Sequence, residues 1–394
     1  MKILMILENE FPPDSRVEKE MISLAREGHQ VDIASYTRHQ RPLKEQFEYY
    51  TVYRKPINWF YFKMSPAALI LPFYFMFWRS FAKKLYKENQ YDVIHTHDLP
   101  LSKVGYYFKK RYKTKLVCDQ HEYYSNWITH TGHYNKGIGK IIKWLSNWTL
   151  YEKKYLNKAD RVVTVEQPLK ECYINEVGLP EEKIVLVPNT PEQEIFNEQN
   201  VDQEIIDHYR HNFMLFYAGG IDLLRGLDIA LEALIILKTQ IPEVKLVIAG
   251  RQAKGFDIVN MAERLNVDDR VEYIPWIDYH QLPSYMAAAK VGFFTPPGNR
   301  DEIHNTIATK IYQYMAMGLP IIVSDVKMMK EFVVNHNIGF IARNKEEFTK
   351  SCIELYQNPE LARTLNDNAK KARDKYYWHN TIKALLEHYK RFKD

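Results

Sequence analysis

The sequence predicts an α/β protein built from two doubly wound domains in tandem. Three observations lead to this fold class. The 394 residues are too many for one ordinary hydrophobic core and suit two domains of about 190 residues each. Short β-rich apolar runs recur along the chain, and each ends in polar residues. Helical patterns fill the gaps between these runs, as expected when the strands form a parallel sheet.

The first half of the chain begins with a strand–helix–strand unit. KILMIL (2–7) is a short apolar run typical of a buried parallel strand. Ser15 and Glu18 have the spacing of a capping box, which predicts a helix through Glu27 that Gly28 ends. Further strands are expected at VDIAS, YDVIHTHD, KLVCDQHE, RVVTVEQP and KIVLVPNTP. This order predicts right-handed crossovers and a parallel sheet.

A polar, acidic stretch, 192–212, is the candidate linker to the second half. We expect a helix over Gly226–Thr239 and another over TKIYQYMAM (309–317). A second series of strands is expected at FMLFYAGG, KLVIAG, RVEYIP, KVGFFTPP, PIIVSD and NIGFIA. Ligands of such sheets bind at the carboxyl ends of the strands, so the polar residues there are the first candidates for a site.

The composition excludes several classes of protein. With 46% hydrophobic and 26% charged residues, the chain is expected to be globular and not disordered. The three cysteines, Cys118, Cys172 and Cys352, show no CxxC spacing, so neither a disulfide framework nor a zinc site is expected. The amino-terminal MKILMILENEF is interpreted as a first strand and not as a signal peptide. We therefore expect a cytoplasmic protein, with the inner face of the membrane as a further location.

Positive charge is concentrated in the first half of the chain. Residues 1–180 hold 28 Lys/Arg against 19 Asp/Glu, whereas the remainder holds 26 against 30. This asymmetry indicates an anionic partner, which would be a membrane surface, a nucleic acid or a phosphorylated substrate. The basic stretches match no recognised nucleic-acid module, so nucleic acid is not expected.

One aromatic segment, WFYFKMSPAALILPFYFMFWRSFAKK (59–84), interrupts the strand–helix pattern. Its uncharged part, 64–78, is shorter than a membrane-spanning helix and contains two prolines. A buried packing helix and an interfacial membrane contact both remain open, because aromatic and basic residues flank the segment. Two more basic-aromatic stretches, 106–115 and 136–148, favour peripheral contact with an anionic membrane, although each alone would be only a solvated helix face.

Polar residues in the first half gather at the predicted strand ends. His95, His97 and Asp98 end one strand, and His121 and Glu122 end another. Their spacing matches no zinc signature, so no metal is expected. A strand-end histidine that donates to a substrate oxygen or phosphate is one interpretation. A histidine that only satisfies loop backbone groups is the alternative.

Two segments of the second half are candidate phosphate sites. In YAGGIDLLRG (217–226), Gly219 and Gly220 allow close approach of a ligand, and the guanidinium of Arg225 suits a pyrophosphate. The turn GNRDEIHNTIA (298–308) precedes a helix whose unpaired N–H groups suit an anion, and Lys310 follows. An ordinary turn between a strand and a helix is the alternative.

Taken together, these motifs resemble the retaining glycosyltransferases of family 4, which have the GT-B fold of two Rossmann-like domains facing a central cleft. FPPDSRVEKEMISLAREGHQV resembles the first loop and helix of that family, and YDVIHTHD and DQHE resemble its strand ends. YAGGIDLLRGLDIALEAL and TKIYQYMAMGLPIIVSD resemble its donor domain. The tail YYWHNTIKALLEHYKRF is similar to the last helix, which crosses back onto the first domain.

The resemblance implies the domain organisation. Residues 1–190 would form the acceptor-binding domain, completed by the C-terminal crossover helix 376–394. Residues 191–375 would bind a nucleotide-sugar, UDP- or GDP-linked, without a metal or another cofactor. The acceptor would be a lipid-linked or cell-envelope saccharide.

The resemblance also implies residue roles. His121 would lie near the transferred sugar, and Arg225 would grip the diphosphate. The residues implied on the acceptor side are Arg16, His97, Asp98 and Glu122. Those implied for donor binding are Gly219, Gly220, Arg225, Arg251, Asn305, Thr306, Lys310 and Gln313.

The sequence departs from the family pattern at three of these positions. The family often has two glutamates eight positions apart where this chain has Asn305 and Gln313, and an arginine where it has Gly220. Gln313 would keep the ribose contact in neutral form, and Asn305 would reach a sugar hydroxyl. Arg251 would replace the missing charge. A non-catalytic GT-B scaffold or partner subunit, and a nucleotide-sugar epimerase, are the alternative functions.

Overall fold

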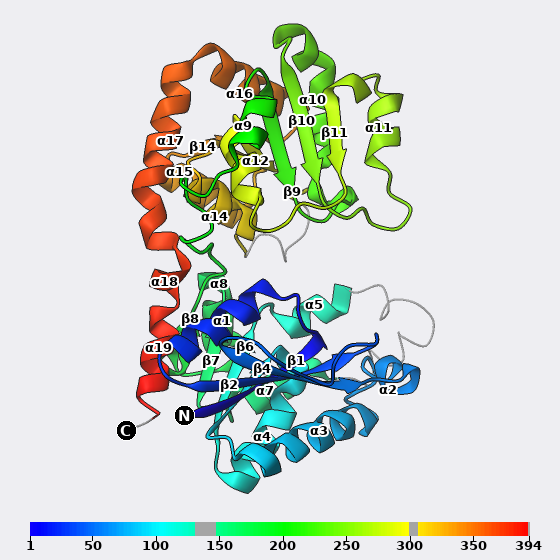
Figure 1. Cartoon of the computed structure of the whole chain (residues 1–394), viewed down its shortest axis with the longest axis vertical. Coiled ribbons are helices and arrows are strands. Elements are labelled where there is room, and N and C mark those ends of the chain that lie inside the picture. Colours follow the sequence, from blue (N-terminus) through cyan, green and yellow to red (C-terminus); the bar gives the residue numbers. More distant parts are fainter. Residues whose placement is uncertain (131–146, 299–305, 393–394) are drawn as a thin grey trace. The chain divides into compact units, whose positions relative to one another are not determined.

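The computed structural model describes residues 1–130, 147–298 and 306–392, and it divides into two compact units. The N-terminal domain comprises 1–189 together with 382–394, and the C-terminal domain comprises 190–381. Figure 1 labels many of the elements of both domains. Each domain is a layered α/β structure around its own hydrophobic core.

The N-terminal domain is built on an eight-stranded sheet in the order β3-β4-β2-β1-β5-β6-β7-β8. Every pair of neighbours is parallel except β3 and β4. The strands are β1 Lys2–Glu10, β2 Gln30–Thr37, β3 Lys44–Gln46, β4 Tyr50–Pro56, β5 Val93–His97, β6 Lys115–Gln120, β7 Arg161–Thr164 and β8 Ile184–Leu186. The α-helices are α1 Ser15–Arg26, α2 Trp59–Lys63, α3 Phe73–Asn89, α4 Ser102–Tyr112, α5 Tyr124–His130, α7 Trp148–Leu156, α8 Gln167–Cys172 and α19 Lys383–Lys390.

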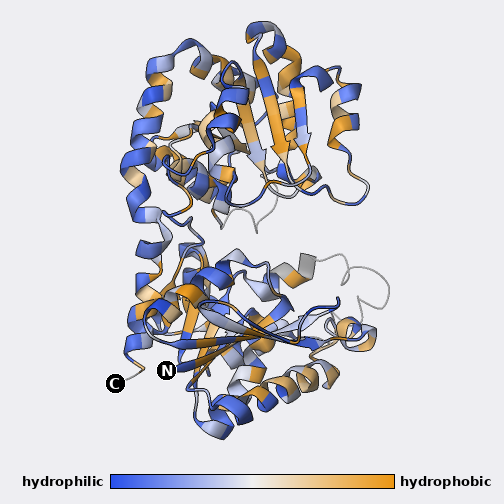
Figure 2. Ribbon diagram, in the orientation of Figure 1, coloured by the Kyte–Doolittle hydropathy of each residue, from blue (hydrophilic) through white to orange (hydrophobic). Residues whose placement is uncertain are grey.

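The C-terminal domain has a six-stranded parallel sheet in the order β11-β10-β9-β12-β13-β14. Figure 2 shows hydrophobic residues along its strands, as buried parallel strands require. The strands are β9 Phe213–Ala218, β10 Val244–Ala249, β11 Val271–Ile274, β12 Val291–Phe294, β13 Ile321–Val323 and β14 Gly339–Ile341. The α-helices are α9 Gln203–Tyr209, α10 Leu227–Gln240, α11 Ile258–Arg264, α12 Leu282–Ala288, α14 Thr309–Ala316, α15 Lys327–His336, α16 Lys345–Gln357, α17 Pro359–Arg373 and α18 Trp378–Thr381. The predicted fold class is confirmed.

The two faces of the N-terminal sheet differ in chemistry. Alternate strand residues such as Leu4, Ile94 and Cys118 join an apolar core with α3, α4 and α7. The residues between them include His95 and Asp119, which are fully buried on the face covered by α1. The α1 face therefore holds polar groups inside the domain, where each needs a partner.

The interdomain linker predicted at 192–212 is wrong. This stretch contains α9, and Phe196 within it is 0% exposed in the core of the C-terminal domain. Tyr377 donates a hydrogen bond to the Phe196 carbonyl at 3.1 Å. The polar composition reflects the exposed side of a packed segment, because a few buried residues are enough to anchor it.

Two helix boundaries also differ from the sequence prediction. The cap of α1 is Asp14, whose carboxylate accepts from the Val17 N–H at 3.1 Å, and Ser15 is already helical. Glu18, expected to complete a capping box, instead accepts from the Tyr50 hydroxyl at 2.5 Å. At the other end of the chain, residues 376–381 belong to the C-terminal domain, and only 382–394 cross back.

The aromatic segment 59–84 forms parts of two helices, α2 and α3, joined by residues 64–72. Trp78 is completely buried in the core, which supports the packing interpretation for one side of α3. Other residues of the segment remain exposed, Trp59 and Met76 among them. Within the described residues, every helix is too short or too polar to span a bilayer.

The loop after β9 is held against the end of β12 by a glycine. Gly226 has φ +68°, and a Cβ added there would lie 1.6 Å from the backbone oxygen of Thr295. The Thr295 hydroxyl donates to the Gly226 carbonyl at 2.8 Å. A glycine is therefore required here both for its conformation and for the close approach of two backbone segments.

We predict that Gly226→Ala destabilises the C-terminal domain by about 3 kcal/mol, because Thr295 must move. Gly255→Ala is the matched control, since Gly255 also has a positive φ of +82° but nothing within 4 Å of the added Cβ. The control should cost about 1 kcal/mol. Urea unfolding of both variants measures the difference, and equal costs would contradict the packing argument.

Candidate functional site

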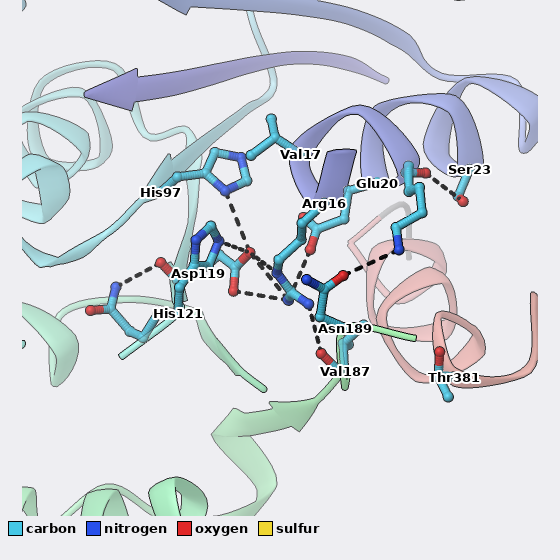
Figure 3. Close-up of polar contacts among 12 residues, drawn as sticks. Arg16, Val17, Glu20, Ser23, His97, Asp119, His121, Val187, Asn189 and Thr381 are labelled. Atoms are coloured by element: carbon cyan, nitrogen blue, oxygen red, sulfur yellow. Dashed lines mark hydrogen bonds and ion pairs between the residues drawn. The ribbon is translucent and has the colours of Figure 1, made fainter. Parts of the chain in front are cut away.

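The centre of the N-terminal site is a buried ion pair between Arg16 on α1 and Asp119 on β6. Arg16 Nη2 lies 3.3 Å from Asp119 Oδ1, and Arg16 Nη1 donates to the Val187 carbonyl at 2.9 Å. Figure 3 shows the guanidinium between these two groups. Burial alone would raise the pKa of Asp119, but the charges of Arg16 and His121 hold it well below its usual range. Asp119 is therefore a carboxylate inside the domain.

His121 follows β6 and binds the same carboxylate. Its Nε2 lies 3.1 Å from Asp119 Oδ2, and its Nδ1 lies 3.8 Å from Asp98 Oδ1. Burial opposes protonation, but Asp119 and Asp98 raise the pKa of His121 to about 9. His121 is therefore an imidazolium near neutral pH and a donor of hydrogen bonds, not a general base.

Four of the buried groups offer ligand atoms to a metal. Atoms of Glu20, His95, His97 and Asp119 all lie within 4.8 Å of one another. Arg16, however, contacts both carboxylates, with Nη2 3.0 Å from Glu20 Oε1. The guanidinium already supplies positive charge at this place, so the cluster has the arrangement of an ion-pair network and not of an open metal site.

Burial favours the neutral form of two further groups of this cluster, Glu20 and His95. Burial, and next the charge of Asp119, raise the pKa of Glu20 well above its usual range. Burial, and then His97, lower the pKa of His95 well below its usual range. The hydroxyl oxygen of Tyr389, on α19, lies 2.9 Å from His95 Nδ1. The helix that crosses back therefore contacts the polar cluster directly.

The strand ends carry further carboxyl groups. Asp98 has φ +64° and ψ 155°, a conformation that non-glycine residues rarely adopt and that often marks functional positions. Burial raises the pKa of Glu8 to about 8; a hydrogen bond from Tyr74 opposes the shift and Asp98 adds to it. Glu122 is an exposed residue, and partial burial of its carboxyl group and the charge of Asp98 raise its pKa, whereas His121 lowers it. Sequence reasoning missed Glu8, whose only signal is a carboxylate at the end of an apolar strand.

In the C-terminal domain, two cations gather where β9 ends. Lys310 Nζ on α14 lies 4.1 Å from the ring centre of Tyr217 and 4.2 Å from that of Phe294. A Cβ added at Gly219 would lie 2.9 Å from the same Nζ. Burial, and next the charge of Arg225, lower the pKa of Lys310 to about 7. Lys310 therefore faces the glycine turn, and no carboxylate among the described residues forms an ion pair with it.

Arg225 is the second of these cations and is 44% exposed. Its Nε lies 3.5 Å from Asp222 Oδ2, the one carboxylate that acts on both cations within the described residues. Gly220 has nothing within 4 Å of an added Cβ, so open space lies where the family often has an arginine. The turn thus combines exposed backbone, open space and excess positive charge, which suits a diphosphate.

Three further residues are predicted to bind the nucleotide-sugar: Arg251, Thr306 and Asn305. The backbone carbonyl of Arg251 accepts a hydrogen bond from the N–H of Ile221 at 3.0 Å. Arg251 is therefore beside the turn, and it is exposed. Thr306 is exposed just before α14. Asn305, although predicted as a donor contact, lies outside the described residues.

Gln313 is 7% exposed and hydrogen-bonded to Tyr279. Tyr279 donates its single O–H to Glu192 Oε2 at 2.9 Å. Gln313 must therefore use its amide N–H as the donor to Tyr279, which a carboxylate could not do. This chain of hydrogen bonds gives a structural reason for a glutamine in the middle of α14, and sequence reasoning missed both partners.

The two domains, each with helices packed on a mostly parallel sheet, define a two-domain α/β protein of the GT-B class. The family model "Glycosyltransferase Family 4" matches residues 20–190, and "Glycosyl transferases group 1" matches residues 198–372. The two matches cover most of both domains. The chain belongs to the family 4 glycosyltransferases with the GT-B fold.

Relatives and solved structures agree with this assignment. The chain is 24% identical over 335 residues to putative glycosyltransferase EpsD of Bacillus subtilis, covering 79% of this chain and 80% of the relative. It is 24% identical over 268 residues to an Escherichia coli UDP-Gal:alpha-D-GlcNAc-diphosphoundecaprenol alpha-1,3-galactosyltransferase, covering 66% and 64%. The structure of Anabaena HepE in complex with UDP superimposes with a TM-score of 0.72 at 16% identity, covering 99% and 100% of the two chains.

We predict that His121 makes stability fall as the pH rises. The folded-state pKa of about 9 lies above the ordinary value, so the stabilisation is complete below about pH 6.5 and is lost through pH 9. His121→Gln should remove about 1–3 kcal/mol of unfolding free energy at low pH and little above pH 9. Urea unfolding across this range measures the effect, with a variant of the exposed His39 as the control. A pH-independent difference between wild type and His121→Gln would contradict the assignment.

We predict that Gln313→Glu destabilises the C-terminal domain by about 1–3 kcal/mol, because the N–H donated to Tyr279 is lost beside Glu192. In a Tyr279→Phe background the same substitution should cost less, as a double-mutant cycle would measure. An additive cycle would show that Gln313 and Tyr279 are not coupled.

Proposed function

We propose that this glycosyltransferase moves a sugar, with retention, from a UDP- or GDP-sugar to a lipid-linked or cell-envelope saccharide. The observation that carries the proposal is the excess positive charge of Arg225 and Lys310 at the glycine turn after β9. A nucleoside diphosphate is the anion that such a turn suits in this family. The UDP in the HepE complex and the undecaprenol-linked substrate in the name of the Escherichia coli relative support the choice of donor and acceptor.

In the proposed reaction, the bond from the anomeric carbon to the diphosphate oxygen breaks while a bond to the acceptor hydroxyl forms on the same face. Arg225 and Lys310 stabilise the departing diphosphate, so no metal is required. The acceptor proton passes to a departing phosphate oxygen. His121, an imidazolium near neutral pH, donates a hydrogen bond to the transferred sugar and does not remove a proton.

A thermal-shift screen with UDP, GDP, ADP and CMP tests the donor class, because a ligand of the folded state raises the melting temperature. Turnover of the matching sugar nucleotide, with and without chelator, then tests transfer and metal independence. A protein that binds a nucleotide but transfers no sugar to any lipid-linked acceptor would be the non-catalytic scaffold. Turnover of the donor without acceptor would indicate an epimerase.

We predict that Arg225→Ala and Lys310→Ala each weaken binding of the selected nucleoside diphosphate about 10- to 100-fold, as expected for a lost charge-assisted contact. Lys371→Ala, which removes an exposed lysine of the same domain, is the control. Because the free Lys310 has a pKa of about 7, wild-type affinity should fall as the pH rises above 7 while Lys310→Arg retains it. Equal affinity of wild type and both alanine variants would contradict the proposed role of Arg225 and Lys310 in binding the diphosphate.

A further inference from the structure

The helices α2, α3 and α4 lie in the most basic part of the chain. Residues 55–115 hold twelve Lys/Arg and three Asp/Glu, an excess of +9 in a chain whose net charge is +5. The strand-end cluster of the N-terminal domain does not account for this charge, since its one arginine, Arg16, is paired with Asp119. Residues 55–115 therefore form a separate electrostatic feature.

Large exposed hydrophobic residues gather on α2, on the start of α3 and on the segment that joins them. Of the fourteen found among the described residues, six lie between 59 and 76, with exposed fractions of 37–74%. The rings of Phe60 on α2 and Phe73 on α3 are 5.6 Å apart, so the two helices present one joint apolar surface. We call this surface the α2–α3 ridge; its members are Trp59, Phe60, Ile70, Leu71, Phe73 and Met76. Patches of this kind mark interaction sites.

Two pockets open beside the ridge, one on each side of α3, and Met76 lines both. The pocket between α3 and α4 has a volume of about 340 Å³, and the pocket between α3 and β4 has about 490 Å³. The first is lined by aromatic and aliphatic groups and by three cations, Arg79, Lys103 and Lys110. The second contains one cation, Lys55, beside Phe77 and Ser80.

The cations of the α3–α4 pocket are not neutralised by the protein. Lys103 Nζ lies 4.5 Å from the ring centre of Phe75, and the Arg79 guanidinium lies 5.2 Å from that of Tyr107. Within the described residues, none of the three cationic side chains forms an ion pair. Burial, and then Lys154 and Arg79, lower the pKa of Lys103. A multiply charged oxyanion such as a phosphate would relieve this repulsion.

The pocket between α3 and β4 also places a cation against an aromatic ring, but only one cation of the described part of the chain, Lys55, lines it. Lys55 Nζ donates to the Ser80 hydroxyl at 3.0 Å and lies 4.2 Å from the ring centre of Phe77. Burial lowers the pKa of Lys55. Each flank of α3 thus combines apolar walls with an ammonium group that has no carboxylate partner among the described residues.

We propose that the α2–α3 ridge and its two flanking pockets form a docking site for an anionic phospholipid membrane. The ridge enters the boundary of headgroups and acyl chains, and Arg79, Lys103 and Lys110 bind a lipid phosphate in the α3–α4 pocket. An exposed apolar surface between cationic, aromatic-lined pockets suits a fluid interface that supplies both acyl chains and phosphates. The site is separate from donor binding and does not depend on the proposed reaction.

The test is co-sedimentation of the full chain with vesicles of phosphatidylcholine alone and of phosphatidylcholine with phosphatidylglycerol. Wild type should bind only the phosphatidylglycerol vesicles. The pocket variant, Arg79→Ala with Lys103→Ala and Lys110→Ala, should partition about 100-fold more weakly. The ridge variant, Phe73→Ser with Met76→Ser, should bind the phosphatidylglycerol vesicles at least about tenfold more weakly than wild type. The salt dependence of its binding should be unchanged.

Matched controls remove comparable groups from the C-terminal domain. Trp276→Ser removes a 69% exposed aromatic residue, and Lys254→Ala with Lys290→Ala and Lys371→Ala removes three exposed cations. Both controls should bind vesicles as wild type does. Equal loss in the triple lysine control would show general electrostatic adsorption, and absence of wild-type binding at low salt would exclude membrane docking; either result overturns the proposal. The nucleotide thermal shift, measured on every variant, reports folding and donor binding separately.

Discussion

The buried pair of Arg16 and Asp119 is the interaction on which the N-terminal site depends. Arg16 joins three segments that are distant in sequence, because it contacts Asp119 on β6 and the carbonyl of Val187 after β8 from its place on α1. Removing one partner would leave the other charged and buried, which typically costs about 3–5 kcal/mol. Asp119 is also the partner of His121, so the same carboxylate fixes the fold and sets the charge of the strand-end histidine.

In the C-terminal domain, by contrast, the positive charges at the site are not fully compensated. Arg225 and Lys310 share one carboxylate, Asp222, and Lys310 rests against two aromatic rings. An anion that binds at the turn would stabilise a cation held in this way, whereas the charges of the N-terminal cluster already compensate one another. The electrostatics of the two domains thus favours the C-terminal turn as the place of the diphosphate.

The sequence predicts the strands well because buried parallel strands are continuous apolar runs that end in polar residues, as KILMIL and KLVIAG show. It fails where a long-range contact decides the outcome. The polar run at 192–212 is anchored by Phe196, and Glu20 is paired with Arg16 and drawn next to Asp119, a residue about a hundred positions away. The position of Lys310 against Gly219 depends on α14 packing beside β9, which spacing along the chain does not reveal.

The departures from the family pattern have compensating contacts, which favours an enzyme over a degenerate scaffold. Gly220 lacks the side chain of the usual arginine, but Lys310 brings a cation to the neighbouring Gly219. Gln313 lacks the charge of the usual glutamate, but its N–H binds Tyr279, which in turn binds Glu192. A glutamate at this position would place a second carboxylate at one phenol and lose the donor that Tyr279 accepts. A site that had lost its function would be under no constraint to keep these partners matched, so the matching supports a donor site rebuilt around a lysine and an amide.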